Sequence, residues 1–322
     1  MRFGVVAIGR NEGRRLEVCL ASLSAASSVV YVDSGSTDDS VTTARDAGAD
    51  VIDLDLAVPF TAARARNTGF ARLRQRDETI DYVQFIDGDC ELVAAWPQQA
   101  LSFLERNPEV AAVAGRRRER FPAQSVYNWL CDLEWSGPAG ETRAFGGDVM
   151  IRARVLAQVG GYREDMIAGE EPELCVRFRA AGWRIWRLEA EMTLHDAAMT
   201  RFAQWWRRSL RAGYAYALGA HLHGRAPEYH KAKESRRAWQ WGVGLPLACV
   251  AAQLEFGLVG AMLWLAYPLQ VARLVLTRRG QLRDRIKVAF FQTLARFPEA
   301  IGQIMFTRDR LLHRQRRLIE YK

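Results

Sequence analysis

The first 200 residues contain no lysine, although the whole chain carries 45 lysines and arginines. A phosphate-binding loop of the G-x-x-x-x-G-K-[ST] type needs a lysine after its glycines, and no such segment occurs. The glycine-rich fingerprint of a nicotinamide-binding site is also missing. These absences exclude two common ways of binding a nucleotide and leave acidic and arginine-based sites to consider.

Cysteine is scarce, with five residues that are scattered and form no C-x-x-C pair. This excludes a disulfide framework and a structural zinc site, and it favours a reducing compartment. The apolar run in "MRFGVVAIGRNEG" is too short for a signal peptide, so we expect no export signal. With 49% hydrophobic residues in 322, the chain is predicted to be globular, as one large domain or a domain with an extension.

Positive charge is concentrated in the last third of the chain. Residues 1–200 carry 23 arginines against 30 acidic residues, whereas residues 201–322 carry 22 basic residues against 7 acidic ones. Such a basic region indicates an anionic partner. Nucleic acid fits poorly, because the charge surrounds a long apolar segment and no nucleic-acid motif is present.

The first half alternates strand-like and helix-like segments, which predicts an α/β fold with a mainly parallel central sheet flanked by helices. The four clearest strands are expected at 3–8, 28–33, 49–56 and 82–87. In such sheets, ligands bind beyond the carboxyl ends of the strands. Asp33 and the pair Asp87 and Asp89 fall at these ends, so we expect a site there.

The acidic residues have both a structural and a functional interpretation. Asp87 and Asp89 in "QFIDGDCEL" form either an ordinary acidic turn or a site for Mg²⁺ or Mn²⁺, which prefer oxygen ligands. Glu170 and Glu171 in "GEEPEL" either complement a helix N-terminus or supply a general base. Asp33, which ends a strand, is suited to accept hydrogen bonds from the base or ribose of a nucleotide.

Taken together, five segments resemble family 2 glycosyltransferases, the inverting enzymes with the GT-A fold, in order and approximate spacing. The resemblance covers roughly residues 3–215 and rests on "VVAIGRNEG", "VVYVDSGSTDDS", "QFIDGDCEL", "FGGDVMIR" and "GEEPELCVRFRAAGW". It implies a nucleoside-diphosphate-sugar donor and a divalent cation, Mn²⁺ or Mg²⁺, as cofactor.

The resemblance also assigns roles to individual residues. It implies a metal ligand at Asp89 and a catalytic base at Glu171, with Glu170 as the second candidate. Glu171 departs from the aspartate usual at this place, which lengthens the side chain by a methylene group. Donor or nucleotide contacts are implied for Asn11, Glu12, Asp33, Arg66, Asn67, Asp87 and Gly147.

Three further features keep two interpretations each. His195 either is a structural histidine or reaches the metal or diphosphate. The segment "QWWRR" resembles the Q-x-x-R-W motif of processive synthases but ends in Arg208 instead of tryptophan. It is either an amphipathic helix or a place where Arg207 and Arg208 bind a phosphate. The run "RRRER" at 116–120 is interpreted as a solvated face or acceptor-side charge.

The most apolar stretch, 242–276, predicts membrane association, with a buried helical hairpin as the alternative. Basic residues follow it directly, as expected beside anionic headgroups on the cytoplasmic side. We therefore predict a GT-A catalytic domain over 1–218, a linker over 219–240, and a helical membrane-associated region with a basic tail over 241–322. The cytoplasmic face of the inner membrane is the predicted location.

The predicted activity is inverting, metal-dependent transfer of a sugar to a hydroxyl of a saccharide or lipid-linked acceptor in surface polysaccharide or glycoconjugate assembly. Two rivals remain at this point. A nucleotidyltransferase of similar fold would normally carry a glycine-rich loop with a nearby lysine, which this chain lacks. A non-catalytic membrane scaffold with a degenerate transferase domain would not need to retain four acidic residues together. They are Asp33, Asp87, Asp89 and Glu171.

Overall fold

A computed structural model describes residues 2–313, and the chain divides into two compact units after Thr200. The catalytic domain predicted for 1–218 ends inside a helix of the second unit, Phe202–His223. The predicted linker, 219–240, contains the end of that helix, a loop and the whole of a further short helix, Ala232–Trp239. Residues 314–322 of the predicted membrane-associated region lie outside the described residues.

The first unit is built on one nine-stranded sheet with the order β3-β2-β1-β4-β8-β6-β9-β5, and β7 pairs with β9. Its strands are β1 (Phe3–Gly9), β2 (Ser28–Asp33), β3 (Asp50–Asp53), β4 (Tyr82–Asp87), β5 (Cys90–Leu92), β6 (Val110–Glu119), β7 (Gly140–Glu141), β8 (Val149–Arg152) and β9 (Arg184–His195). β1 to β4 are parallel, and β8 runs antiparallel between β4 and β6.

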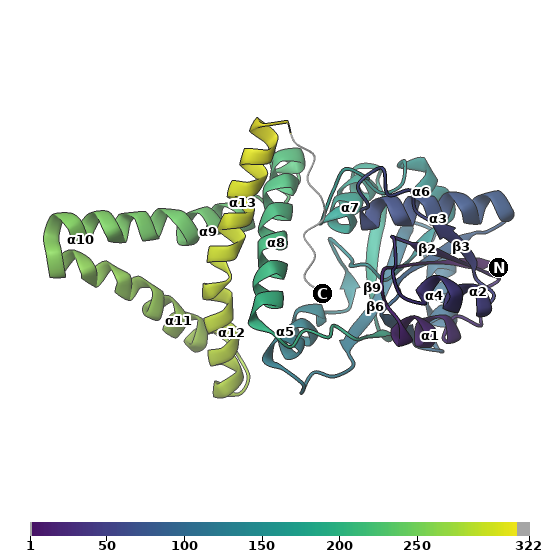
Figure 1. The fold of residues 1–322 in the computed structure, drawn as a ribbon, viewed down its shortest axis with the longest axis horizontal. Coiled ribbons are helices and arrows are strands. Elements are labelled where there is room, and N and C mark those ends of the chain that lie inside the picture. Colours follow the sequence, from purple (N-terminus) through teal and green to yellow (C-terminus); the bar gives the residue numbers. More distant parts are fainter. Residues whose placement is uncertain (1, 314–322) are drawn as a thin grey trace. The chain divides into compact units, whose positions relative to one another are not determined.

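Helices lie on both faces of this sheet (Figure 1). They are α1 (Arg14–Ala21), α2 (Ser40–Asp46), α3 (Ala62–Arg76), α4 (Trp96–Arg106), α5 (Val126–Trp135), α6 (Ala153–Gln158) and α7 (Glu170–Ala180). Consecutive residues of β1 and β4 are buried, as strands covered on both faces require. The predicted α/β fold with helix-flanked sheet is therefore confirmed.

Two strands extend beyond the segments that the sequence predicted. β6 continues from the apolar run at 110–115 through the arginines to Glu119, and β9 continues from 184–188 to His195. These two strands pair in parallel, with register shifts near Ala114 and Arg116. Pairing with a long neighbour therefore keeps a polar run in the sheet, where composition alone indicated a solvated segment.

The second unit is helical. It contains α8 (Phe202–His223), α9 (Ala232–Trp239), a π-helical turn (Gln240–Gly244), α10 (Leu245–Ala261), a 3₁₀ turn (Met262–Leu265), α11 (Ala266–Thr277), α12 (Leu282–Leu294) and α13 (Arg296–Leu311). α8 and α13 pack closely at two glycines. A Cβ on Gly213 would lie 2.0 Å from the carbonyl oxygen of Glu299, and one on Gly302 would lie 2.1 Å from that of Leu210. The close approach of the helices therefore requires glycine.

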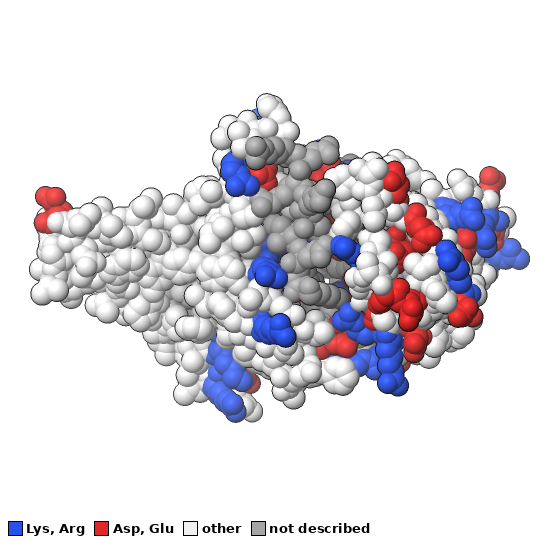
Figure 2. All heavy atoms as spheres, viewed as in Figure 1, with Lys and Arg blue, Asp and Glu red and all other residues white. Residues whose placement is uncertain are grey.

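α10 and α11 form a hairpin that projects from the α8–α13 pair (Figure 1). Gly257, at φ +54°, interrupts the helical backbone between the arms. Large apolar side chains point outward along them, with Leu254 83% and Leu258 90% exposed. Figure 2 shows this hairpin almost free of charged residues on the face in view. Between Arg237 and Arg273 the sequence has one charged residue, Glu255.

Within residues 2–313, one helical stretch, Ala232–Thr277, is long and apolar enough to cross a membrane by length and composition. Only 11% of its most apolar window is buried. The alternative of a hairpin buried in a soluble core therefore does not describe these residues.

Candidate active site

The carboxyl ends of β1, β2 and β4 meet at one edge of the sheet, as parallel pairing requires. The loop after β1 binds the loop after β2. Asn11 adopts a left-handed conformation, with φ 55°, and its Oδ1 accepts a hydrogen bond from the Thr37 amide at 2.7 Å. The Asn11 amide donates to Ser36 Oγ at 2.9 Å. The two predicted nucleotide-contact segments therefore form one structure.

Asp33 is buried and accepts several hydrogen bonds from its own neighbourhood. Its Oδ2 accepts from the amides of Gly35 and Ser36 at 2.8 and 2.7 Å. Its Oδ1 accepts from the hydroxyls of Ser36 and Tyr31 at 2.5 and 3.1 Å. These bonds fix the loop that follows β2, so Asp33 shapes this part of the edge whatever else it binds.

Asp87 lies between two arginines. Oδ1 is 2.9 Å from Nη2 of Arg66, and Oδ2 is 3.0 Å from Nη2 of Arg117. Burial alone would raise the pKa of Asp87, but the two guanidinium groups outweigh it and hold that pKa well below its usual range. Asp87 is therefore ionised and already compensated by positive charge.

Arg66 also reaches the two glutamates that begin α7. Its Nη1 lies 2.9 Å from Oε1 of Glu170 and 3.3 Å from Oε1 of Glu171. One guanidinium, 2% exposed, therefore connects the acidic loop after β4 with the acidic start of α7.

The two glutamates differ in environment. Glu170 is almost fully buried against Arg66, whereas the Glu171 side chain is 16% exposed. Burial, together with repulsion from Glu170, raises the pKa of Glu171 to about 7, although Arg66 partly opposes the rise. A carboxylate with this pKa can accept a proton near neutral pH.

Gly147 and Asp148 complete the contacts of Asp87. A Cβ on Gly147 would lie 2.5 Å from Oδ2 of Asp87 and 2.8 Å from Nη2 of Arg66, so only glycine fits there. Asp148 accepts a hydrogen bond from the Asp87 amide at 3.1 Å and pairs with Arg117 at 2.8 Å. The predicted position of Gly147 thus lies directly against the acidic loop.

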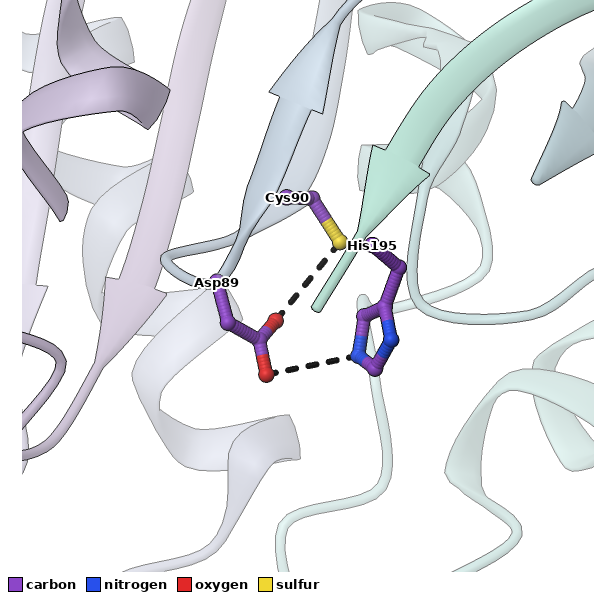
Figure 3. Close-up of side chains that lie close together, drawn as sticks. All are labelled: Asp89, Cys90 and His195. Atoms are coloured by element: carbon purple, nitrogen blue, oxygen red, sulfur yellow. Dashed lines mark hydrogen bonds and ion pairs between the residues drawn. The ribbon is translucent and has the colours of Figure 1, made fainter. Parts of the chain in front are cut away.

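Asp89 and His195 form a second, separate group, which also includes Cys90 (Figure 3). β5 pairs with β9 so that Cys90 lies opposite His195. Oδ2 of Asp89 is 3.3 Å from Nε2 of His195, and both side chains are buried. Candidate ligand atoms of Asp89, Cys90 and His195 lie within 4.8 Å of one another.

The chemistry of these donors fits a divalent cation. Burial raises the pKa of the Cys90 thiol well above its usual value, so the thiol stays protonated. Burial lowers the pKa of His195, so its imidazole is neutral near pH 7 and has a lone pair to offer. One carboxylate and one imidazole suit Mn²⁺ better than Mg²⁺, which prefers oxygen ligands alone.

The other predicted residues have different surroundings. Asn67 accepts a hydrogen bond from the Tyr162 amide and donates to the Tyr162 carbonyl and to Glu164, all at 2.8 Å, so it ties α3 to that loop. Glu12 pairs with Arg15 at 2.8 Å. Arg207 and Arg208 lie on α8 of the second unit, and their part in donor binding stays a prediction.

Sequence reasoning missed Arg117 and Glu119 in the "RRRER" run. Arg117 compensates Asp87, and Oε2 of Glu119 lies 3.6 Å from Nδ1 of His195. A strand pattern could have revealed them, because side chains of a strand point alternately to its two faces. Arg118 is exposed, whereas Arg117 and Glu119 on either side of it point inward. The interpretation of this run as a solvated face is therefore wrong for these two residues.

Comparison with known proteins gives a match to a family model and a similar fold. Residues 5–145 match the family model described as "Glycosyl transferase family 2". Curated relatives include the "Pre-mycofactocin glycosyltransferase" of two Mycobacterium tuberculosis strains, each 28% identical over 145 residues. The match covers 42% of this chain and 30% of each relative, so it spans less than a third of their length.

Solved structures support the fold over nearly the whole chain. A mannosyltransferase from Pyrobaculum calidifontis in complex with GDP-Man and Mn²⁺ has a TM-score of 0.63 at 20% identity, covering 94% of this chain and 87% of that one. S. aureus TarS has a TM-score of 0.51 at 13% identity, covering 94% and 54%. The predicted GT-A-like fold is thereby confirmed.

Proposed function

Because residues 5–145 match the family model "Glycosyl transferase family 2", we propose that this chain transfers a sugar, with inversion, from a nucleoside-diphosphate sugar to a hydroxyl group. The observation that carries the proposal is the buried Arg66, which contacts both Asp87 and Glu171. It connects the acidic loop that precedes the candidate cation site with a carboxylate suited to act as a base.

Glu171 is the proposed catalytic base. Its raised pKa lets it accept the proton of an acceptor hydroxyl at neutral pH. The oxygen then attacks the anomeric carbon on the side opposite the bond to the diphosphate, and a single displacement inverts the configuration. Glu170 is more buried and is held by Arg66, so it acts on Glu171 by repulsion and takes no proton from the acceptor itself.

The donor would bind along the same edge of the sheet. Asp89 and His195 would hold the cation, which when bound supplies positive charge to the departing diphosphate. Asn11, Glu12 and Asp33 would face the nucleoside. Arg66 and Arg117 keep Asp87 ionised, so that it can accept hydrogen bonds from the ribose or the sugar.

The second unit would hold the enzyme on a membrane. Its exposed apolar hairpin supports this placement, as do the arginines at 278, 279, 283 and 285 that follow it. This placement accords with a position on the cytoplasmic leaflet. It also accords with a lipid-linked or saccharide acceptor in surface polysaccharide or glycoconjugate assembly. Arg207 and Arg208 are proposed to bind phosphate of the donor or acceptor.

Two experiments test the activity. A thermal-shift screen of nucleoside diphosphates with and without Mn²⁺ identifies the donor base, because ligand binding stabilises the folded state. Donor hydrolysis or transfer is then compared among the wild type, Asp89→Ala and Glu171→Gln. We expect both variants to lose activity, and full activity in both would overturn the site assignment.

A further inference from the structure

His195 contacts an acidic side chain through each of its ring nitrogens. Nε2 lies 3.3 Å from Oδ2 of Asp89, and Nδ1 lies 3.6 Å from Oε2 of Glu119. Trp135 meets the imidazole edge-on, with ring centroids 4.6 Å apart. The ring is therefore confined by the turn after β4, by β6 and by α5.

Hydrogen bonds hold the Glu119 carboxylate in place. Its side chain is fully buried, and both carboxylate oxygens already accept hydrogen bonds. Oε1 accepts from the Phe121 amide at 3.1 Å and from Asn128 Nδ2 at 3.2 Å. Oε2 accepts from the Ala197 amide at 3.1 Å. Because all of these partners are donors, Glu119 is held as an acceptor that faces Nδ1.

This arrangement favours one form of the imidazole once a cation is bound. A neutral histidine carries a proton on one nitrogen and a lone pair on the other. Both ring nitrogens face carboxylates here, so a bound cation decides between them. When a cation lies at Asp89, Nε2 would supply its lone pair as a ligand, and the proton is then on Nδ1, the nitrogen that faces Glu119. Two atoms with lone pairs 3.3 Å apart are stable neighbours when a cation lies between them.

We propose that Glu119 is a positioning residue for the metal site: it fixes the Nδ1–H form and the orientation of His195, so that Nε2 ligates the divalent cation with Asp89. The inference rests on the proposed function, because it presupposes the cation site at Asp89. A carboxylate behind a ligating imidazole raises its basicity and typically contributes about 10- to 100-fold to metal affinity.

Glu119→Gln tests the proposal through the tautomer. Oε1 receives two donors and Oε2 one, so the amide nitrogen of the glutamine belongs on the Oε2 side. There it would donate to Nδ1 and force the proton onto Nε2, which then has no lone pair for a metal. We expect Mn²⁺ affinity, measured from the electron paramagnetic resonance signal of free Mn²⁺, to fall about 10- to 100-fold.

A double-mutant cycle separates this role from a structural one. If Glu119 acts through His195, Glu119→Gln added to His195→Ala should weaken Mn²⁺ binding no further than His195→Ala alone. Glu191→Gln, an exposed acid on the same strand as His195, is the matched control and should bind Mn²⁺ like the wild type. Unchanged Mn²⁺ affinity in folded Glu119→Gln, or full additivity in the cycle, overturns the proposal.

Loss of the Ala197 hydrogen bond will also lower the stability of Glu119→Gln, so a measurement that keeps Glu119 in place is needed as well. In Asp89→Ala, where the competing carboxylate at Nε2 is removed, the ¹⁵N shifts of His195 should report the Nδ1–H form, and a dominant Nε2–H form would overturn the proposal. Asp89→Ala checks the proposed function separately. If it abolishes Mn²⁺ binding while Glu119→Gln leaves it unchanged, only the role of Glu119 fails.

Discussion

At the scale of single residues, the site depends on the different surroundings of two neighbouring glutamates. Glu170 lies against Arg66, whereas Glu171 keeps a raised pKa and some exposure. The same burial that makes ionisation of Glu171 costly makes its carboxylate a better proton acceptor once ionised. Two predictions follow from this difference.

Replacing Glu171 with glutamine should lower kcat about 10²- to 10⁴-fold, because general-base catalysis contributes about that factor. Donor binding should persist, since the amide keeps the size of the side chain. Activity is measured by transfer or donor hydrolysis, and binding by nucleotide-dependent thermal shift. Asp165→Asn, an exposed acid paired with Arg163, is the control and should retain activity. Equal activity of Glu171→Gln and the wild type would remove Glu171 from the mechanism.

The pH dependence follows from the pKa of about 7 for Glu171. Below that pH the carboxyl group is protonated and cannot accept a proton, so kcat/KM should fall about tenfold per pH unit. Above it the base is ionised and the profile should level off. Steady-state rates between pH 5 and 9 at saturating Mn²⁺ measure this limb. If this acidic limb is missing from the residual activity of Glu171→Gln, the limb reports the ionisation of Glu171. If the limb is unchanged in that variant, it reports another group.

At the scale of elements, α3 holds the site together through one side chain. Arg66 faces Asp87, Glu170 and Glu171 at once, and Tyr162 lies near its guanidinium, 5.5 Å from the ring centroid to Cζ. Without this cation, three carboxylates would face one another in a largely buried place. The arginine therefore makes possible the approach of α7 to the loop after β4.

Arg66→Met should destabilise the fold by about 3–5 kcal/mol, since removing one partner leaves uncompensated buried charge. Denaturant unfolding at pH 7.5 measures the loss. Arg72→Gln on the same helix, which breaks the more exposed pair with Asp50, should cost far less. Equal losses of stability in the two variants would show that Arg66 contributes no more than the exposed Arg72–Asp50 pair, and would contradict its role in compensating buried charge.

The sequence predicted some of these elements closely and missed others for identifiable reasons. "SVVYVD" forms β2 over the expected residues, and Thr61 caps α3 by accepting from the Arg64 amide at 3.1 Å. Local apolar runs and caps carry such signals. The continuation of β6 through Arg117 and Glu119 depends instead on pairing with β9, which follows some 65 residues later in the chain. Long-range pairing is what a local pattern does not contain.

The candidate site shows the same limit. The carboxylates at strand ends were predictable, because the ends of parallel strands meet at one edge. The arginines that compensate the charge of these carboxylates were not predictable, because Arg117 reaches Asp87 from β6, a strand distant in the sequence. The sequence also left open whether Asp87 or Asp89 would be screened by positive charge. In the structure Asp87 pairs with arginines, and Asp89 faces His195.

At the scale of the whole molecule, the chain joins an acidic unit to a basic one. Residues 1–200 have a net charge of −7 and residues 201–322 of +15, and the boundary between the compact units falls at the same place. The second unit also contains the exposed apolar hairpin. Positive charge beside a large apolar surface fits an anionic lipid surface, since headgroups attract the charge and acyl chains accept the apolar side chains.

The hairpin gives a sharp test of this placement. Leu247 in α10 and Leu269 in α11 lie ten and twelve residues from Gly257, where the helical backbone is interrupted, and are 64% and 66% exposed. If the arms enter a bilayer, Leu247→Arg with Leu269→Arg places two charges in hydrocarbon, at about 2.5–3.5 kcal/mol each on insertion scales. The full-length double variant should then move from the membrane pellet to the supernatant.

The control is Leu247→Ala with Leu269→Ala, which shortens the same side chains without charge and should stay with the membrane. In a water-exposed hairpin, by contrast, arginine at these positions would be harmless or would improve solubility, since neither side chain is buried in the fold. A wild type that remains in the supernatant without detergent, or a double-arginine variant that pellets as the wild type does, would contradict membrane attachment through this hairpin. The experiment needs no knowledge of the sugar or the acceptor, so it tests the role of the second unit independently of the chemistry proposed for the first.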